Sequence, residues 1–301
     1  MKTSVFSPGR INLIGEHTDY NHGYVLPAAI DLGIHLNISL SGQPKQCTFY
    51  SEEMDKKFAL SLERLPESGS GWENYLLGVL HELLALGGPL QGFDCRIRST
   101  LPVGAGLSSS AALSCGLTLG LNALFSLGLD RLQMAALAQR VENRFAALQC
   151  GIMDPFASLM GRSGHFILLD CKSLEYDYIP AEMGDFELVL LDSGVAHELA
   201  TSGYNQRRDE CRRAVAWLAN RFGNIDSLRD LKPAQWKAVR NTMPEPLRSR
   251  CRHVLEENRR AKQAVRALET GDMEGLGALL YASHQSLSED YEVSCPELDF
   301  L

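Results

Sequence analysis

The sequence lacks an excess of positive charge. Lys and Arg total 29 against 37 Asp and Glu, so the formal net charge is −8. A chain with this balance has no broad basic field to attract a nucleic-acid backbone or anionic lipid head groups. We therefore expect no nucleic-acid partner and no membrane partner, and any phosphate must be bound by a local set of groups.

Cysteine occurs eight times, but no two cysteines lie at CxxC spacing and none has a histidine at metal-ligand spacing. This scatter argues against a disulfide framework and against a zinc site, and it favours a reducing compartment. The first residues also lack the apolar core of a signal peptide. We therefore expect a cytoplasmic chain.

An uninterrupted apolar span is missing as well. Residues 99–129 carry no charged side chain, which raises the question of a membrane helix. However, Pro102, Gly104 and Gly106, followed by three serines, break the first half of this stretch. We expect instead a buried helix that is entered through a glycine loop.

With 301 residues and 45% apolar letters, the chain is long enough for two domain cores. Strands are predicted where apolar residues alternate or form short runs, at 34–40, 58–62, 165–169 and 188–191. Helices are predicted from apolar spacing and end signals over 73–86, 111–127, 130–148, 204–222 and 248–268. The Arg- and Glu-rich composition of the last two favours solvent-facing helices. We place a domain boundary within 180–195, which gives domains 1–185 and 186–301 of an α+β protein.

A glycine- and serine-rich loop lies between a predicted strand and the apolar helix, in the string PVGAGLSSSA at 102–111. Glycines let backbone amides approach an anion, the following helix start adds its positive end, and serine hydroxyls bind phosphate or a metal ion. The string matches neither GxxxxGK[ST] nor GxGxxG. A tight turn with a serine cap is the structural alternative, but it explains only one glycine and one serine.

Polar side chains crowd the end of the first apolar strand. Glu16, His17 and Asp19 follow one another there, and carboxylates with an imidazole offer the mixed donors and acceptors that a polyol requires. Two further acids, Glu142 and Asp154, suit a hard cation and an acceptor hydroxyl. Each of these two, taken singly, also fits an ordinary surface acid.

Four strings together resemble one family. They are PGRINLIGEHTDYN at 8–21, GAGLSSSA at 104–111, GIMD at 151–154 and YNQRR at 204–208. The chain resembles the galactokinases, which belong to the GHMP small-molecule kinases, essentially from end to end. The glycine-serine loop is shared across the superfamily, whereas GEHTDYN is particular to galactokinases and their nearest relatives.

The resemblance implies a GHMP kinase fold, with an S5-like N-terminal domain, a ferredoxin-like C-terminal domain and both substrates in the cleft between them. It implies ATP-dependent phosphorylation of D-galactose to galactose 1-phosphate with Mg²⁺. Asp154 matches the catalytic acid that accepts or attracts the proton of the anomeric hydroxyl. Arg10 matches the arginine that stabilises charge in phosphoryl transfer, and Ser110 and Glu142 match the magnesium ligands.

Substrate contacts are implied in the same way. The ATP side corresponds to Gly104, Ala105, Gly106, Leu107, Ser108, Ser109 and Ser110, with Ser51 and Trp72. The galactose side corresponds to Glu16, His17, Thr18, Asp19, Gly151, Asp154 and Tyr204.

The sequence also departs from the family. A third glycine-rich motif that normally follows a segment like 295–299 is missing, and Pro155 stands where glutamine is common. We therefore expect an incomplete C-terminal domain and keep two alternatives. One is a non-catalytic sugar and nucleotide sensor, or an inactive truncated paralogue; the other is a related GHMP kinase for arabinose or N-acetylgalactosamine. A complete chain is expected to be a monomer.

Overall fold

The computed structural model describes residues 1–102, 104–146, 149–195 and 203–301. The chain forms two compact units. Unit 1 comprises Met1–Ile11 and Ala29–Gly161, and unit 2 comprises Asn12–Ala28 and Arg162–Leu301. This grouping differs from the predicted division after residue 185, because residues 12–28 and 162–185 both belong to unit 2.

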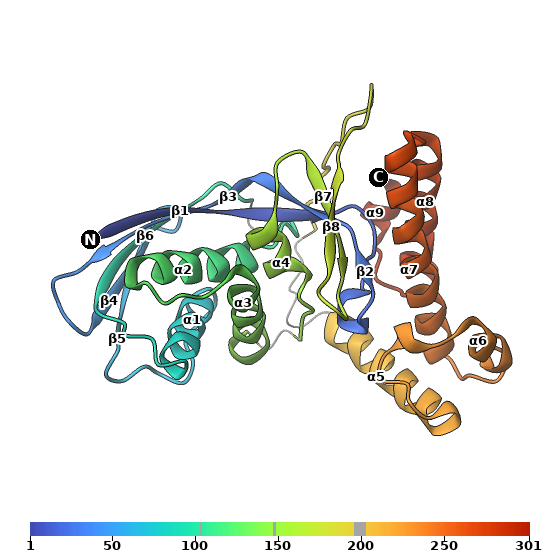
Figure 1. Ribbon diagram of the computed structural model, residues 1–301, viewed down its shortest axis with the longest axis horizontal. Coiled ribbons are helices and arrows are strands. Elements are labelled where there is room, and N and C mark those ends of the chain that lie inside the picture. Colours follow the sequence, from blue (N-terminus) through green and yellow to red (C-terminus); the bar gives the residue numbers. More distant parts are fainter. Residues whose placement is uncertain (103, 147–148, 196–202) are drawn as a thin grey trace. The chain divides into compact units, whose positions relative to one another are not determined.

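Unit 1 is built on a five-stranded sheet with the order β1-β3-β6-β4-β5. The strands are β1 (Lys2–Asn12), β3 (Pro27–Leu40), β4 (Gln46–Ser51), β5 (Lys56–Ser61) and β6 (Phe93–Ser99). The helices are α1 (Glu73–Ala85), α2 (Ser109–Phe125), α3 (Arg131–Phe145) and α4 (Met153–Met160). Figure 1 shows α1, α2 and α3 on one face of this sheet.

The alternation of apolar and polar residues along the strands determines which face of the sheet the helices cover. Ile34, Leu36 and Ile38 on β3 are buried, together with Phe93 and Cys95 on β6. Because successive side chains of a strand point to opposite faces, these residues form one apolar face against the helices. The prediction of strands at 34–40 and 58–62 is confirmed, the second ending at Ser61.

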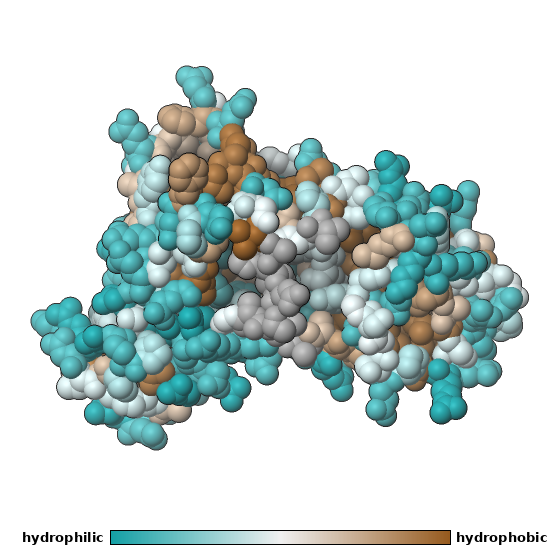
Figure 2. All heavy atoms as spheres, turned by 180° about the vertical axis from the view of Figure 1, so that it is seen from behind, coloured by the Kyte–Doolittle hydropathy of each residue, from teal (hydrophilic) through white to brown (hydrophobic). Residues whose placement is uncertain are grey.

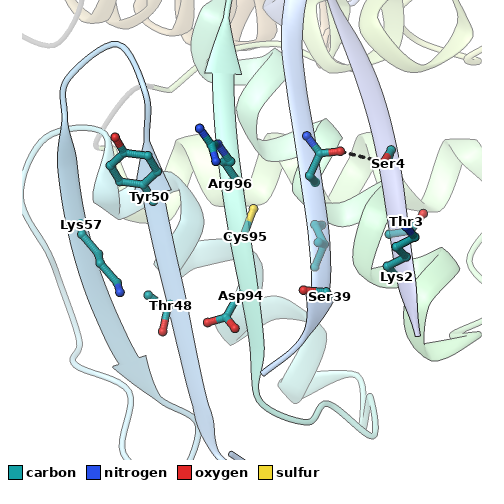
Figure 3. Close-up of a pocket in the computed structure, with 12 residues that line it drawn as sticks. Lys2, Thr3, Ser4, Ser39, Thr48, Tyr50, Lys57, Asp94, Cys95 and Arg96 are labelled. Carbon is teal, nitrogen blue, oxygen red and sulfur yellow. Dashed lines mark hydrogen bonds between the residues drawn. The ribbon is translucent and has the colours of Figure 1, made fainter. Parts of the chain in front are cut away.

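The opposite face of the sheet is polar. Figure 3 shows Tyr50, Lys57, Asp94 and Arg96 on neighbouring strands of this face, around a hollow of about 620 Å³. None of the residues predicted for the site lines this hollow.

The predicted helices of unit 1 form with small shifts at their ends. Asp130 caps α3 as expected, since its side chain accepts a hydrogen bond from the Gln133 amide at 2.8 Å. The predicted end of this helix at Leu148 lies outside the described residues. The helix predicted at 111–127 begins two residues earlier and ends two residues earlier, as α2.

Unit 2 combines a three-stranded sheet with helices. The order β2-β7-β8 joins β2 (Tyr24–Val25), β7 (His165–Asp170) and β8 (Tyr176–Pro180). Tyr24 pairs with Asp170, which is why residues 12–28 belong to this unit. The helices are α5 (Gly203–Phe222), α6 (Pro233–Val239), α7 (Leu247–Thr270), α8 (Met273–Glu289) and α9 (Pro296–Phe300), with short 3-10 turns η1 (Asp19–Asn21) and η2 (Leu228–Asp230).

Two predictions for unit 2 were wrong. Residues 188–191 form no strand, and Val189 and Leu191 are 69% and 63% exposed. No other described strand pairs with this segment, and an unpaired strand leaves its backbone groups and one apolar face unsatisfied. Helix α7 is also not simply solvent-facing, because its buried residues include Arg250, His253 and Glu257.

The face of the molecule drawn in Figure 2 is mainly hydrophilic. Figure 2 shows hydrophilic side chains over most of the visible face, with apolar patches between them. Among the described helices, none combines the length and the apolar character needed to cross a membrane.

Candidate active site

Three predicted residues meet in unit 1 around the carboxylate of Asp154. Arg10 donates from Nε to Asp154 Oδ1 at 2.8 Å and from Nη2 to Oδ2 at 2.9 Å. The Ser108 hydroxyl donates to Oδ2 at 2.5 Å. Arg10 lies on β1, Ser108 precedes α2, and Asp154 is in the first turn of α4. A two-point guanidinium contact fixes the orientation of the carboxylate as well as its position.

The glycine loop has an unusual backbone. Gly104 and Gly106 have φ angles of +79° and +71°, and Ser108 has a φ of +58°. Left-handed backbone at a non-glycine residue costs energy and is typical of functional sites. The Gly106 carbonyl accepts a hydrogen bond from Arg10 Nη1 at 2.7 Å, and the Leu107 carbonyl accepts one from the Arg10 amide at 3.2 Å. Val103, which also falls in the predicted loop, lies outside the described residues.

The start of α2 is arranged to receive an anion. Ser108 is the residue before the helix, but its side chain makes no capping hydrogen bond and binds Asp154 instead. The first amides of a helix have no partner within the helix, and the helix dipole is positive at this end. Ser109, Ser110 and the loop before them therefore offer amides and hydroxyls to a phosphate group.

Glu142, the second predicted acid, is buried beside this loop. It is 1% exposed, and its carboxylate accepts hydrogen bonds from the Ser110 hydroxyl and the Cys150 thiol, both at 2.8 Å. Burial, with the negative charge of Asp154, raises the pKa of Glu142 to about 7. The ionised form of the Glu142 carboxylate is therefore disfavoured at this site unless a cation lies close to it.

The oxygen atoms around Glu142 suit a magnesium ion that takes its remaining ligands from phosphate groups and water. Among the described residues, no three His, Cys, Asp or Glu side chains converge as a metal site. Mg²⁺ is commonly held by one or two carboxylates together with substrate phosphates and water. The adjacent oxygens of Ser110 and Glu142 are of the required hard type.

Four of the predicted sugar contacts, residues 16–19, lie together in unit 2, in the turn after β1. The Glu16 carboxylate accepts from the Asn12 side chain at 2.9 Å, and the Asp19 carboxylate accepts from the Tyr20 amide at 2.8 Å. Thr18 is fully buried, and its hydroxyl donates to the carbonyl groups of Gly15 and Tyr24, both at 2.7 Å. Thr18 therefore braces the turn.

A cavity of about 380 Å³ within unit 2 brings three of the predicted sugar residues together. Glu16, His17 and Tyr204 line it, the last from the first turn of α5. The rings of His17 and Tyr204 lie 5.5 Å apart. Carboxylate, imidazole and phenol groups around one hollow provide the donors and acceptors that a monosaccharide needs.

The imidazole of His17 is held neutral. Burial, with the nearby His253 and the positive charge of Arg207, lowers the pKa of His17 to about 3. Its Nδ1 shares a hydrogen bond of 2.9 Å with the Tyr20 hydroxyl. A neutral ring has one donor and one acceptor, and the Tyr20 hydroxyl can pair with either, so this contact fixes the orientation of the ring.

Among the described contacts, none joins Ser51, Trp72 or Gly151 to the residues around Asp154 or to those that line the cavity. Ser51 is buried at the end of β4, Trp72 precedes α1 with its ring 5.3 Å from that of Phe58, and Gly151 is buried just before α4. Their assignment to nucleotide and sugar contacts stays a prediction.

Other residues of the site were missed by sequence reasoning. Cys150 contacts Glu142, and Tyr20 contacts His17. His253 and Glu257 on α7 bind the backbone of the turn that carries Glu16. Cys150 and Tyr20 stand next to motif residues in the sequence, and this position could have identified them. His253 and Glu257 give no such signal, because they lie more than two hundred residues from the turn that they contact.

Family models match two parts of the chain. Residues 74–162 match the GHMP kinases N terminal domain, and residues 2–40 match the galactokinase galactose-binding signature.

Curated relatives match nearly the whole chain. It is 42% identical over 300 residues to a protein named galactokinase from Roseiflexus sp. (strain RS-1), covering 99% of this chain and 75% of that relative. It is 41% identical over 297 residues to a galactokinase of Thermotoga neapolitana, covering 99% and 81%.

Solved structures show the same likeness. The chain superimposes on Lactococcus lactis galactokinase complexed with galactose with a TM-score of 0.94 and 38% identity, covering 100% of this chain and 78% of that one. A Methanococcus jannaschii mevalonate kinase gives a TM-score of 0.63 at 18% identity, with 100% and 82% coverage, and so shares the fold.

Proposed function

Since the chain belongs to the galactokinase family of the GHMP kinases, we propose that it transfers the terminal phosphoryl group of ATP to the anomeric hydroxyl of galactose, giving galactose 1-phosphate and ADP. The observation that carries the proposal is the Asp154 carboxylate, fixed by Arg10 and Ser108 next to the glycine loop. Phosphoryl transfer needs positioning and charge stabilisation more than covalent chemistry, and this group supplies both.

In unit 1, Asp154 accepts or attracts the proton of the anomeric hydroxyl as the new oxygen–phosphorus bond forms. Arg10 keeps the carboxylate in one orientation and adds positive charge close to the transferred group. The loop from Gly104 to Ser110 and the first amides of α2 bind the phosphates of ATP. Ser51 and Trp72 are assigned to the nucleotide side on the family resemblance alone.

We assign Ser110 and Glu142 as the protein ligands of Mg²⁺. The cation, when bound, neutralises charge that develops on the phosphate oxygens. Glu142 then carries its negative charge in a buried setting that otherwise favours its protonated form. Cys150 and the Ser110 hydroxyl orient its two oxygens.

In unit 2, Glu16, His17, Asp19 and Tyr204 recognise the sugar hydroxyls. A site built from such hydrogen-bonding groups discriminates between sugars, because a ligand with a hydroxyl in the wrong place leaves buried polar groups unpaired. Gly151 and Thr18 complete the proposed set, the second by bracing the turn.

A coupled assay of ADP release over a panel of monosaccharides tests the function. We expect turnover with galactose and not with its epimer glucose. Turnover with arabinose or N-acetylgalactosamine while galactose is inert would overturn the proposed substrate. It would leave the assignment as a sugar kinase intact. Calorimetry that shows galactose and ATP binding without any turnover would favour the sensor. A cytoplasmic location and a monomeric state stay predictions.

A further inference from the structure

The turn that carries the proposed sugar contacts has a strained backbone. Gly15 has a φ of +101°, and a Cβ atom at this position would lie 2.5 Å from the Tyr24 carbonyl oxygen and 2.8 Å from the Val25 Cα. His17 has a φ of +61° although it is not glycine. Glycine adopts a positive φ freely, whereas a non-glycine residue such as His17 keeps one only where surrounding groups hold it.

Two side chains of α7 bind this turn through its backbone. The Glu257 Oε1 atom accepts hydrogen bonds from the amides of Gly15, at 2.9 Å, and Glu16, at 3.2 Å. His253 Nε2 lies 3.0 Å from the carbonyl oxygen of Glu16. Residues four apart on a helix lie on the same face, so the two side chains approach the same peptide segment. Figure 1 shows α7 beside β2, the strand that follows this turn.

Each of the two side chains is itself fixed and shielded from water. Both are 0% exposed. Glu257 Oε1 also accepts from the Ser283 hydroxyl at 2.7 Å, and Oε2 accepts from Arg260 Nε at 2.6 Å. Buried carboxylates are tolerated when they are paired and fully hydrogen-bonded in this manner. Glu257 therefore presents a rigid acceptor to the turn.

The protonation of His253 follows from its partners. Burial lowers the pKa of His253, so the ring is neutral and carries one N–H. A carbonyl oxygen only accepts, so this N–H must be on Nε2, pointing at Glu16. The Ser286 hydroxyl then donates to Nδ1 at 2.9 Å, and the Tyr291 ring lies 4.4 Å from the imidazole.

We propose that His253 and Glu257 are positioning residues for sugar binding: they clamp the peptide of Gly15 and Glu16 so that the Glu16 and His17 side chains line the cavity in the orientation that binds the sugar. The inference rests on the proposed function for the identity of the ligand. It adds two residues that do not touch the sugar and act only through the backbone of the turn.

The test compares His253→Leu with His253→Gln. Leucine fills the space without a donor, whereas glutamine places an amide N–H near the position of Nε2. We expect His253→Leu to weaken galactose binding in calorimetry about tenfold, the equivalent of one lost hydrogen bond. The KM for MgATP should change less than twofold, and His253→Gln should recover most of the lost affinity. Arg259→Ala, an exposed position on the same helix, is the control and should leave both values unchanged.

Hydrogen exchange at the Gly15 and Glu16 amides provides a readout that needs no sugar. Exchange should accelerate in His253→Leu and Glu257→Gln and stay slow in His253→Gln and in Arg259→Ala. Faster exchange with unchanged galactose affinity would overturn the positioning role, as would an equal loss of affinity in the Leu and Gln variants. A wild-type chain that binds no galactose would overturn the proposed function instead, while the exchange data would still decide whether α7 clamps the turn.

Discussion

Arg10 holds both oxygens of Asp154 through two parallel hydrogen bonds, although the two residues are 144 positions apart in the chain. The same guanidinium donates from its third nitrogen to the Gly106 carbonyl of the phosphate loop. One side chain therefore ties the proposed catalytic acid to the loop that we propose binds the phosphates of ATP.

Replacement of Asp154 by asparagine keeps the shape of the side chain and removes its charge. If Asp154 assists removal of the hydroxyl proton, kcat should fall by about 10²–10⁴. The affinity for galactose should change much less. Steady-state kinetics with calorimetry separates the two effects, and near-normal turnover of Asp154→Asn would show that the acid is dispensable.

Replacement of Arg10 by lysine retains the charge but cannot reproduce a planar three-point contact. We expect kcat to fall by about 10- to 100-fold, in the range of one lost electrostatic contact. The double variant Arg10→Lys/Asp154→Asn should lose less than the product of the two single losses, because the residues act as one unit. Strictly multiplicative losses would contradict this coupling.

The raised pKa of Glu142 predicts that the free energy of unfolding depends on pH in metal-free buffer. Its folded pKa of about 7 lies above its ordinary value of 4.5, so the folded chain binds this proton more tightly than the unfolded chain does. The stabilisation is complete below the ordinary pKa and is lost as the pH rises through 7. From pH 4.5 to 8, urea unfolding should show wild type losing on the order of 3 kcal/mol relative to Glu142→Gln.

Asp154→Asn is the matched control for this measurement. It removes the nearby charge that helps to raise the pKa of Glu142, so the loss of stability should be smaller than in wild type and should be complete at a lower pH. A pH profile of Glu142→Gln that runs parallel to wild type would refute the role given to Glu142.

Tyr20→Phe removes the hydroxyl that contacts His17 Nδ1 and, at 2.9 Å, the Tyr291 hydroxyl. Without it, the His17 ring loses the hydrogen bond at Nδ1 that holds its orientation. We expect galactose affinity to fall about five- to tenfold, as for one hydrogen bond, with the KM for MgATP unchanged. Tyr50→Phe, whose hydroxyl binds Asp55 on the surface, is the control.

The exposed apolar segment around residues 186–191 predicts self-association. Contiguous apolar surface of this kind promotes association, whereas single exposed apolar residues do not. The double change Val189→Lys/Leu191→Glu should reduce light scattering of concentrated samples without lowering the melting temperature, since both side chains are largely exposed. Leu86→Gln, a single exposed position, should leave scattering as it is.

The sequence by itself determined what depends on neighbours along the chain. The glycine loop, the cap of α3 at Asp130 and the ends of α5 and α7 at Gly223 and Gly271 are local properties, because backbone freedom and capping act within a few residues. The motif at 8–21 identified the family because it is also a local feature of the sequence. These short strings require particular residue types at fixed spacing.

Tertiary structure decided what depends on partners far away in the chain. Leu188 to Leu191 had the pattern of a strand, but a strand exists only where another strand pairs with it. The stretch that forms α7 was expected to be a solvent-facing helix, yet its His253 and Glu257 side chains are buried against the turn at Gly15 and Glu16. A polar side chain can be buried only if its hydrogen-bonding partners are supplied, and here they come from more than two hundred residues away, where no pattern along the sequence reveals them.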